Sequence, residues 1–184
     1  MQTRTRDDIR SLDRFLASVE RRAFRIARIA LGNDDDALDA VQDAMLQLAR
    51  RYAARPSAEW PPLFYRILRN RLRDMQRRRA VRRRVFAWLP GLGRQADDSV
   101  DPIELVPDAR PSPPEQLATA QAMATLERAL GTLPGRQLEA FMLRTFEGLD
   151  VAGTAFAMGC SEGSVKTHYS RAVHALREQL GEID

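Results

Sequence analysis

Apolar residues recur every three or four positions along most of the chain, which is the period of amphipathic α-helices. No stretch alternates apolar and polar residues as a half-buried strand would. The first predicted helix ends at Gly32, a residue type that favours helix termination. Its apolar stripe consists of Leu12, Phe15, Leu16, Val19, Ala23, Ile26, Ala27 and Ala30. The pattern therefore predicts an all-α protein.

Two further helices are predicted in the first half of the chain. Asn33 and Asp34 are candidate N-caps of the second, in which Asp35 and Asp36 lie at the positive end of the helix dipole. The proline pair at 61–62 opens the third, since proline is tolerated in a first helical turn. The expected buried faces are Leu38, Val41, Met45, Leu48 and Tyr52 in the second helix, and Phe64, Ile67, Leu68, Leu72 and Met75 in the third.

A linker separates this half from a second helical region. Six of the ten prolines lie between positions 90 and 114, among glycines and acidic residues. We expect an N-terminal domain at 1–88, a Pro- and acid-rich linker at 89–111, and a C-terminal domain at 112–184. The C-terminal domain is predicted to contain four helices in about 70 residues, a size that can fold alone.

The four C-terminal helices have local start and stop signals. Ser112 and Glu115 form a capping box around two prolines, and Gly131 is expected to end that helix. Its apolar residues are Leu117, Ala120, Ala124, Leu126 and Leu130. The next helix is expected to end at Gly148 with Leu138, Phe141, Met142 and Phe146 inside. Two short helices then flank a turn near Gly159.

This last pair has the spacing of a helix-turn-helix. Ala155 is small where two helices cross, Gly159 permits the tight turn, and Val165 is β-branched on the buried side. Ser161 is a candidate cap. The inward residues are Val165, Tyr169, Ala172, Val173, Leu176 and Leu180, and the outward ones are Ser164, Lys166, Thr167, His168 and Arg171. The outward set suits base edges and phosphates of a major groove, and an ordinary helical hairpin with a solvated face is the alternative.

The third helix continues into a strongly basic run. Residues 65–84 contain ten arginines opposed by one acid, Asp74. Trp60, Phe64 and Tyr65 precede the run, and Trp60 and Tyr65 fall off its apolar stripe. Arginines neutralise phosphates and aromatic rings stack on unpaired bases, so the combination favours single-stranded or melted nucleic acid. The alternative is a solvated, solubilising face.

Composition narrows the classes of function. The net charge is +4 and the pI about 9.9, carried almost wholly by arginine because Lys166 is the only lysine. A single cysteine, Cys160, suits a reducing compartment, and with no signal-like or membrane-spanning run we expect a cytoplasmic protein. His168 and His174 are the only histidines, and phosphate-loop, paired-Cys and nucleophile-elbow motifs are missing. We therefore expect no catalysis, cofactor or metal.

Three blocks together resemble a known family. The segments DDDALDAVQDAMLQL, then LFYRILRNRLRDMQRRR after a Trp, then LPGRQLEAFMLRTFEGLDVAGTAFAMGCSEGSVKTHYSRAVHALREQL resemble a bacterial RNA polymerase sigma factor of the extracytoplasmic-function group. The resemblance implies an N-terminal domain that recognises and melts the minus-ten element and a C-terminal helix-turn-helix that reads the minus-thirty-five element. It implies core RNA polymerase, through its β′ clamp and β subunits, and promoter DNA, duplex and melted, as partners. An anti-sigma factor or another regulator is a further candidate partner.

The resemblance also implies roles for individual residues. Those that match the polymerase-docking helix are Asp39, Gln42 and Asp43. Those that match the melting and minus-ten stretch are Trp60, Tyr65, Asn70, Arg71, Asp74 and Arg77. Those that match the recognition helix are Ser164, Lys166, Thr167 and Arg171. Stacking and phosphate contacts would stabilise melted DNA without any catalytic step.

Two positions depart from the family pattern. Leu38 replaces an acid in the docking helix, which is expected to alter the polymerase-binding surface. Gly153 lies where the first helix of the helix-turn-helix usually has an acid, and it costs that helix about 1 kcal/mol. Two other functions stay open: a helix-turn-helix regulator that binds duplex DNA without joining polymerase, and a nucleic-acid-processing enzyme with a helical DNA-binding tail.

Overall fold

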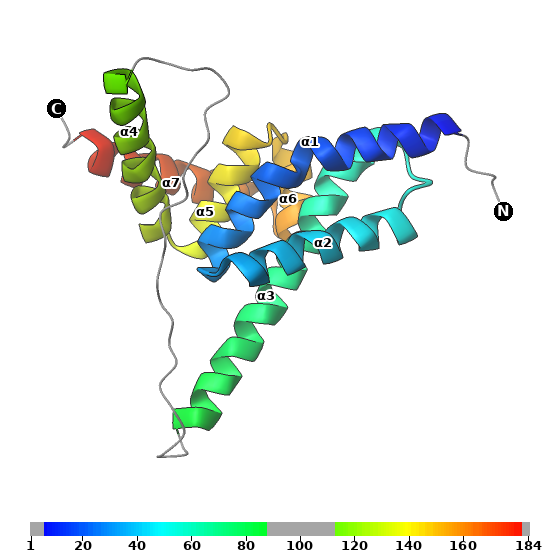
Figure 1. Ribbon diagram of the computed structural model, residues 1–184, viewed down its shortest axis with the longest axis horizontal. Helices are drawn as coiled ribbons and strands as arrows, with labels where there is room; N and C mark the ends of the chain where they lie inside the picture. The colour runs from blue at the N-terminus through cyan, green and yellow to red at the C-terminus, as the bar shows by residue number, and fades with distance from the viewer. Residues whose placement is uncertain (1–5, 88–112, 182–184) are drawn as a thin grey trace.

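The computed structural model describes residues 6–87 and 113–181, and every regular element in these ranges is helical (Figure 1). The first half contains α1 (Arg6–Leu31), α2 (Asp34–Arg51), a 3₁₀ turn (Ser57–Glu59) and α3 (Trp60–Ala87). The second contains α4 (Pro113–Thr132), α5 (Gly135–Phe141), α6 (Val151–Met158) and α7 (Glu162–Gly181). The predicted all-α class is confirmed. The predicted linker at 89–111 lies outside the described residues.

The tight turn between α1 and α2 follows its local sequence signals. Gly32 has a φ of +65°, a left-handed conformation that favours glycine. Asn33 is the N-cap of α2, and its Oδ1 accepts a hydrogen bond from the Asp36 amide at 2.9 Å. Gln76 and Arg79 of α3 donate to the last carbonyls of α1, at Ala30 and Leu31. The turn is therefore held both by its own cap and by the neighbouring helix.

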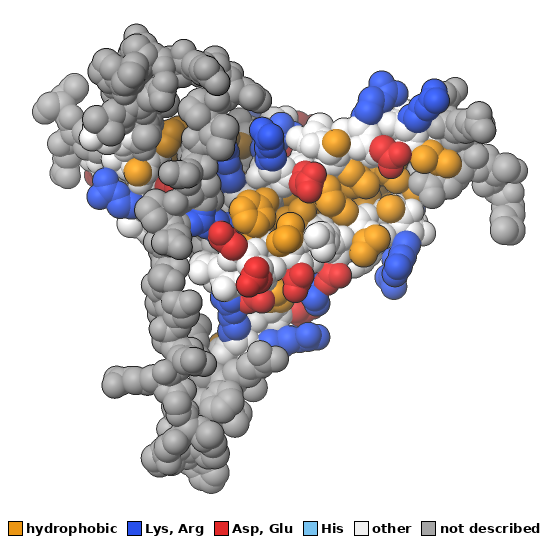
Figure 2. Space-filling model, viewed as in Figure 1, with side chains coloured by type: hydrophobic (Ala, Val, Ile, Leu, Met, Phe, Trp, Pro, Cys, Tyr) orange, Lys and Arg blue, Asp and Glu red, His pale blue; other side chains and the backbone are white. Residues whose placement is uncertain are grey.

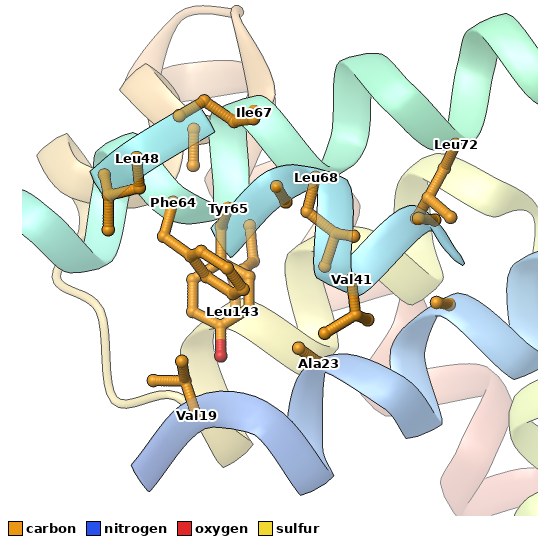
Figure 3. Packing of buried hydrophobic residues seen from close by; sticks show 14 of the residues in the cluster. Val19, Ala23, Val41, Leu48, Phe64, Tyr65, Ile67, Leu68, Leu72 and Leu143 are labelled. Atoms are coloured by element: carbon orange, nitrogen blue, oxygen red, sulfur yellow. The ribbon is translucent and has the colours of Figure 1, made fainter. Parts of the chain in front are cut away.

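The first three helices pack through the predicted apolar stripes, with one correction. Figure 3 shows Ala23 of α1, Val41 and Leu48 of α2, and Phe64 and Leu68 of α3 pointing into one core. Leu38, expected on the buried face of α2, is instead 44% exposed. The small residues Ala37, Ala40 and Ala44 occupy the contact face of α2, which lets α1 and α3 approach closely and turns Leu38 outward. Tyr52 and Met45 pack at the edge of the core.

The helix expected to run to Gly148 is interrupted. α5 ends at Phe141 and continues as a π turn, Met142–Phe146, in which the Glu147 amide bonds to the Met142 carbonyl at 3.2 Å. The wider turn rotates Phe146 off the inner face, so its expected burial is wrong: the ring is 41% exposed. The chain still reverses at Gly148, where φ is +64°. α4 runs one residue beyond the predicted stop, to Thr132.

The helix-turn-helix forms as predicted. Gly159 between α6 and α7 has a φ of +59°, and Val165 is fully buried beneath the turn. Ser161 Oγ accepts a hydrogen bond from the Ser164 amide at 3.2 Å, which confirms its capping role. Gly153 does not break α6, because the Asp150 side chain caps the helix by accepting from the Gly153 amide at 2.6 Å. Leu180, expected inward, is 37% exposed in the last turn of α7.

The two halves of the chain share a core. α6 packs along α3, and Leu143, Ala155, Met158 and Val165 belong to the same buried cluster as the N-terminal stripes. Leu143 and Tyr65 are both members of this cluster (Figure 3). A second cluster, confined largely to α4, α5 and α7, fills the rest of the C-terminal half. The division at 88 and 112 into two domains stays a prediction.

Charged contacts cross between the halves as well. Arg69 of α3 and Glu139 of α5 form an ion pair at 2.8 Å in which the side chains are 12% and 19% exposed. Burial lowers the pKa of Arg69 and raises that of Glu139, and the facing guanidinium of Arg69 opposes the rise at Glu139. Arg22 of α1 donates from Nε to both carboxylate oxygens of Glu147, at 3.0 and 3.1 Å.

Removing one partner of the Arg69–Glu139 pair should destabilise the fold. Glu139→Gln should lower the free energy of unfolding by about 1 to 3 kcal/mol, because it leaves the largely buried Arg69 without its counter-charge. Denaturant titration measures the change. Glu59→Gln, which breaks the exposed Arg55–Glu59 pair, is the matched control and should cost no more than about 1 kcal/mol.

The double variant Arg69→Met with Glu139→Leu tests the cause. It should be more stable than Glu139→Gln, because two apolar side chains remove the charges from the interface together. A double variant less stable than the single one would show that the interface depends on the ion pair itself.

Candidate nucleic-acid and polymerase interfaces

The outer face of α7 begins directly after the turn of the helix-turn-helix. Lys166, Thr167 and Arg171 are exposed there, and Ser164 is half-buried beside them. Ser164 Oγ lies 2.9 Å from Ser161 Oγ, and the Thr167 hydroxyl donates to the Gly163 carbonyl at 3.0 Å. These bonds orient the hydroxyls while their oxygens can still accept. The structure thus brings the four predicted recognition residues onto one helical face.

The arginines of α3 divide into two groups. Arg69, Arg71 and Arg79 each form an ion pair with an acid on another helix. The exposed residues include Arg73, Arg78 and Arg77, and Arg77 pairs only with Asp74 of the same helix, at 3.3 Å, among the described residues. The C-terminal half of α3 projects from the body of the molecule (Figure 1). The basic run is therefore anchored on one side and free on the other.

The predicted minus-ten residues do not share one environment. Asn70, Asp74 and Arg77 are exposed on α3, and Arg71 is half-buried against α2. Trp60 and Tyr65, expected off the buried stripe, are buried instead, with 4% and 3% exposure. The expectation that both rings lie off the buried face of the helix is therefore wrong.

Trp60 is buried because α3 starts at this residue rather than at the proline pair that follows. Counted from Trp60, the spacing to Phe64 and Ile67 is the i, i+4, i+7 pattern of one buried face. The indole Nε1 donates to the Tyr52 carbonyl at 3.2 Å, and the ring lies 5.9 Å from Phe15, centroid to centroid. Trp60 therefore joins all three N-terminal helices.

Tyr65 is covered by the C-terminal half. Its ring packs edge-on against Phe64 with centroids 5.1 Å apart, and Leu143 lies beside it (Figure 3). Burial raises the pKa of the Tyr65 hydroxyl above its ordinary value, and the neighbouring Glu147 carboxylate adds to the rise. The hydroxyl is thus protonated at neutral pH. Sequence spacing alone gave no sign of this cover, because Glu147 and Leu143 are distant along the chain.

The predicted docking residues lie together on the outer face of α2. Asp39, Gln42 and Asp43 are all exposed, and Asp43 contacts Arg71 at 2.5 Å. Leu38 and Leu46 are 44% and 51% exposed on the same helix. Figure 2 shows acidic side chains gathered over α2, next to apolar side chains between α1 and α2. This face combines negative charge with apolar surface.

The described ranges contain neither a metal-binding cluster nor a membrane-spanning helix. No three His, Cys, Asp or Glu side chains in residues 6–87 and 113–181 converge in a way that would hold a metal ion. No helix in the described part of the chain has the length and apolarity needed to cross a bilayer.

Comparison with known proteins identifies the family. Residues 123–176 match the family model described as "Sigma-70, region 4", a range that runs from the second half of α4 through α5 and α6 into α7. The chain is 30% identical over 179 residues to ECF RNA polymerase sigma factor SigM of Mycobacterium tuberculosis, covering 95% of this chain and 79% of that protein. The chain is an extracytoplasmic-function sigma factor. ECF sigma factor SigF of Caulobacter vibrioides is also 30% identical, over 92% of this chain and 84% of its own.

Solved structures show the same fold. The sigma factor RpoE of Bartonella quintana, solved in complex with the anti-sigma factor NepR, superposes with a TM-score of 0.67 at 24% identity, covering 96% of this chain and 98% of its own. CnrH, solved with the cytosolic domain of CnrY, has a TM-score of 0.56 at 20% identity.

Family membership settles the general activity of the chain. Sigma factors of this family bind core RNA polymerase and direct promoter-specific transcription initiation, so promoter DNA and core polymerase are the partners of this sigma factor. The family consists of regulatory transcription factors rather than enzymes. The alternative of a regulator that acts without polymerase is not favoured.

The burial of Trp60 predicts a structural role for it. Trp60→Ala should lower the free energy of unfolding by about 3 to 5 kcal/mol, because it empties a buried site between three helices. Trp60→Phe should cost less, since the ring is kept and only the bond to the Tyr52 carbonyl is lost. Thermal or denaturant unfolding measures both. Leu46→Ala, at a half-exposed site on α2, is the control and should cost less than about 1 kcal/mol.

Proposed function

We propose that the sigma factor divides promoter recognition between three surfaces. α7 reads the minus-thirty-five element as a duplex, the exposed face of α3 contacts the minus-ten element, and the outer face of α2 docks on the β′ clamp of core polymerase. The observation that carries this assignment is that each predicted residue set lies on its own accessible helical face, apart from the buried Trp60 and Tyr65 and the half-buried Arg71.

The recognition surface consists of Ser164, Lys166, Thr167 and Arg171. Lys166 and Arg171 supply positive charge for phosphates and for the acceptor edge of guanine, and the hydroxyls of Ser164 and Thr167 accept or donate to either base type. All four follow the turn of the helix-turn-helix, where the recognition helix of such motifs enters the major groove. The exposure of Lys166 and Arg171 supports the proposal.

The minus-ten surface consists of Asn70, Arg71, Asp74, Arg77 and Tyr65. Asn70, Asp74 and Arg77 are exposed in this arrangement of the helices and can contact DNA without any rearrangement. Tyr65 stacks on an unpaired base only after Leu143 and Glu147 have moved from it, so melting requires the two halves to separate at this contact. Trp60 contributes by fixing the start of α3 rather than by touching DNA.

The docking surface consists of Asp39, Gln42 and Asp43. The carboxylates and the amide offer acceptors to donor groups of the polymerase, and the neighbouring Leu38 adds apolar area where the family pattern has an acid. We propose that the chain acts in the cytoplasm by binding alone, without catalysis. An anti-sigma factor is proposed as its regulator, since both solved neighbours are described in complexes, one with an anti-sigma factor.

Replacing Lys166 and Arg171 with alanine tests the recognition surface. The double variant should weaken binding to the upstream promoter element at least about ten-fold and reduce the salt dependence of binding by about one to two ions. Binding to core polymerase should be unchanged. In vitro transcription with purified core enzyme on a promoter library, with filter binding of DNA, makes the measurement.

Arg177→Ala is the matched control for this experiment. Arg177 is an exposed arginine of the same helix, fewer than two turns beyond Arg171 and outside the recognition surface. It should leave promoter selection intact. Normal transcription by the Lys166 and Arg171 double variant from every promoter would refute the recognition surface.

Tyr65 variants test the melting role. Tyr65→Ala should slow promoter opening about ten- to a hundred-fold, measured by permanganate reactivity of promoter thymines, because stacking on an unpaired base contributes about 1 to 3 kcal/mol. Tyr65→Phe keeps the ring and should open promoters nearly normally. A pre-melted bubble template should rescue the alanine variant, whereas equal loss on duplex and bubble would contradict a role in melting. Circular dichroism confirms that each variant is folded.

A further inference from the structure

One ion pair joins two surfaces that are proposed to bind different partners. Asp43 on α2 belongs to the polymerase-docking surface, and Arg71 on α3 belongs to the minus-ten surface. Their Oδ2 and Nη2 atoms lie 2.5 Å apart, with the side chains 49% and 34% exposed. Each group is therefore accessible to an outside partner while it is held by the other.

The pair is positioned by the packing of α2 on α3. Leu72, next to Arg71, and Ala44, next to Asp43, are both buried in the shared core, so the two backbones cannot drift apart. The Arg71 Nε is buried with no hydrogen-bond partner among the described residues, and its outer nitrogen is held by Asp43. The guanidinium thus faces α2 rather than the exposed side of α3, where Asn70 and Asp74 lie.

Both partners of the pair have competing uses. A phosphate oxygen of DNA would compete with Asp43 for the guanidinium of Arg71, and a donor group of polymerase would compete with Arg71 for the carboxylate of Asp43. A guanidinium has five N–H donors and a carboxylate two oxygens, so an outside partner can bind before the pair opens, but the single charge of each group is then shared between two partners. Each binding event must therefore weaken or break the pair.

We propose that the Asp43–Arg71 pair couples polymerase docking to DNA binding in this sigma factor, so that either partner, once bound, frees the charge that the other needs. The proposal rests on the proposed function of these two surfaces. The first partner to bind breaks the pair, and the second then binds without having to break it. By linkage, the effect on the two affinities is equal.

The size of the coupling follows from the exposure of the pair. Partly exposed ion pairs contribute about 0.2 to 1 kcal/mol, which corresponds to an increase of up to about five-fold in the affinity for the second partner. The effect is modest, and it is sensitive to salt because both charges are near solvent. A double-mutant design at low ionic strength is therefore needed to measure it.

The DNA side of the coupling is measured without polymerase. The probe is a fluorescein-labelled duplex with a central unpaired bubble, titrated with the full chain. Asp43→Asn should raise the affinity about two- to five-fold, because Arg71 is released. When Arg71 has already been replaced by alanine, Asp43→Asn has no arginine to release. It should then raise the affinity for the DNA probe only as much as the loss of any one negative charge from α2.

Asp36→Asn supplies that reference for the loss of charge. Asp36 pairs with Arg79 between the same two helices, and both side chains are 35% exposed. Arg79 also donates to the Leu31 carbonyl, so it stays held when its acid is neutralised. Asp36→Asn should therefore raise DNA affinity less than Asp43→Asn does.

The polymerase side is measured without DNA. Arg71→Ala should raise the affinity of the chain for purified core polymerase about two- to five-fold, because Asp43 is released. Arg77→Ala is the control. It removes the same charge from α3, but Arg77 pairs with Asp74 of its own helix and not with the docking surface. A merely structural role for Arg71 would lower the affinity or leave it unchanged.

The outcomes separate the coupling from the proposed function. The coupling is supported if Asp43→Asn raises the affinity for DNA and Arg71→Ala raises the affinity for polymerase, each by more than its control. The gain in DNA affinity should also disappear in the double variant. If Arg71→Ala weakens DNA binding and Asp43→Asn weakens polymerase binding, but neither produces the gain at the opposite site, the coupling is refuted and the surfaces stand. If Arg71→Ala has no effect on DNA binding, or Asp43→Asn none on polymerase binding, both the surface assignment and the coupling are refuted.

Discussion

The packing of α3 against both halves of the chain is the contact on which the other features depend. One side of its N-terminal half completes the core with α1 and α2, and the other side receives α6 and the π turn after α5. A helix covered on two sides must be apolar over a wide arc, which explains why Trp60, Phe64, Tyr65, Ile67 and Leu68 are all buried. Only beyond Leu72 does α3 become polar enough to project into solvent.

The two-sided contact also decides what the arginines of α3 do. Where the helix is covered, Arg69, Arg71 and Arg79 meet acids of other helices and stabilise the packing. On the uncovered side Arg73 and Arg78 are exposed and Arg77 contacts only Asp74 of its own helix among the described residues, so an external anion can reach them. A basic run in a sequence is thus not one surface. Its members differ in their contacts and exposure according to which side of the helix they occupy.

Local signals predicted the fold well, and non-local contacts explain where the prediction failed. Gly32, Asn33, Gly159 and Ser161 act through their own backbone or the next turn, so their roles were evident in the sequence. The π turn, which exposes Phe146, and the cover of Tyr65 by Glu147 depend on how distant segments pack. No periodicity reveals such contacts.

The candidate site shows the same division. The residues of α7 and α2 were placed correctly on accessible faces, because one amphipathic helix defines its own inner and outer sides. Leu38 and Trp60 were misplaced for different reasons. Leu38 was expected to be buried because it is more hydrophobic than the alanines that form the contact face of α2. Trp60 was expected off the buried face because the start of α3 was placed one residue too late.

With α3 assigned to the minus-ten element and α7 to the minus-thirty-five element, as proposed above, the dimensions of a promoter require the shared core to open. The minus-ten and minus-thirty-five elements are about 25 base pairs apart, which is about 85 Å along B-form DNA. The longest helix here, α3 with 28 residues, spans about 42 Å, and the helix-turn-helix packs directly against it. The predicted linker at 89–111 has 23 residues, and an extended chain of that length reaches at most about 80 Å, close to the separation that the two elements need. The charged contacts at the junction, Arg69–Glu139 and Arg22–Glu147, suit such an interface, because separated ions regain the hydration that the closed arrangement denies them.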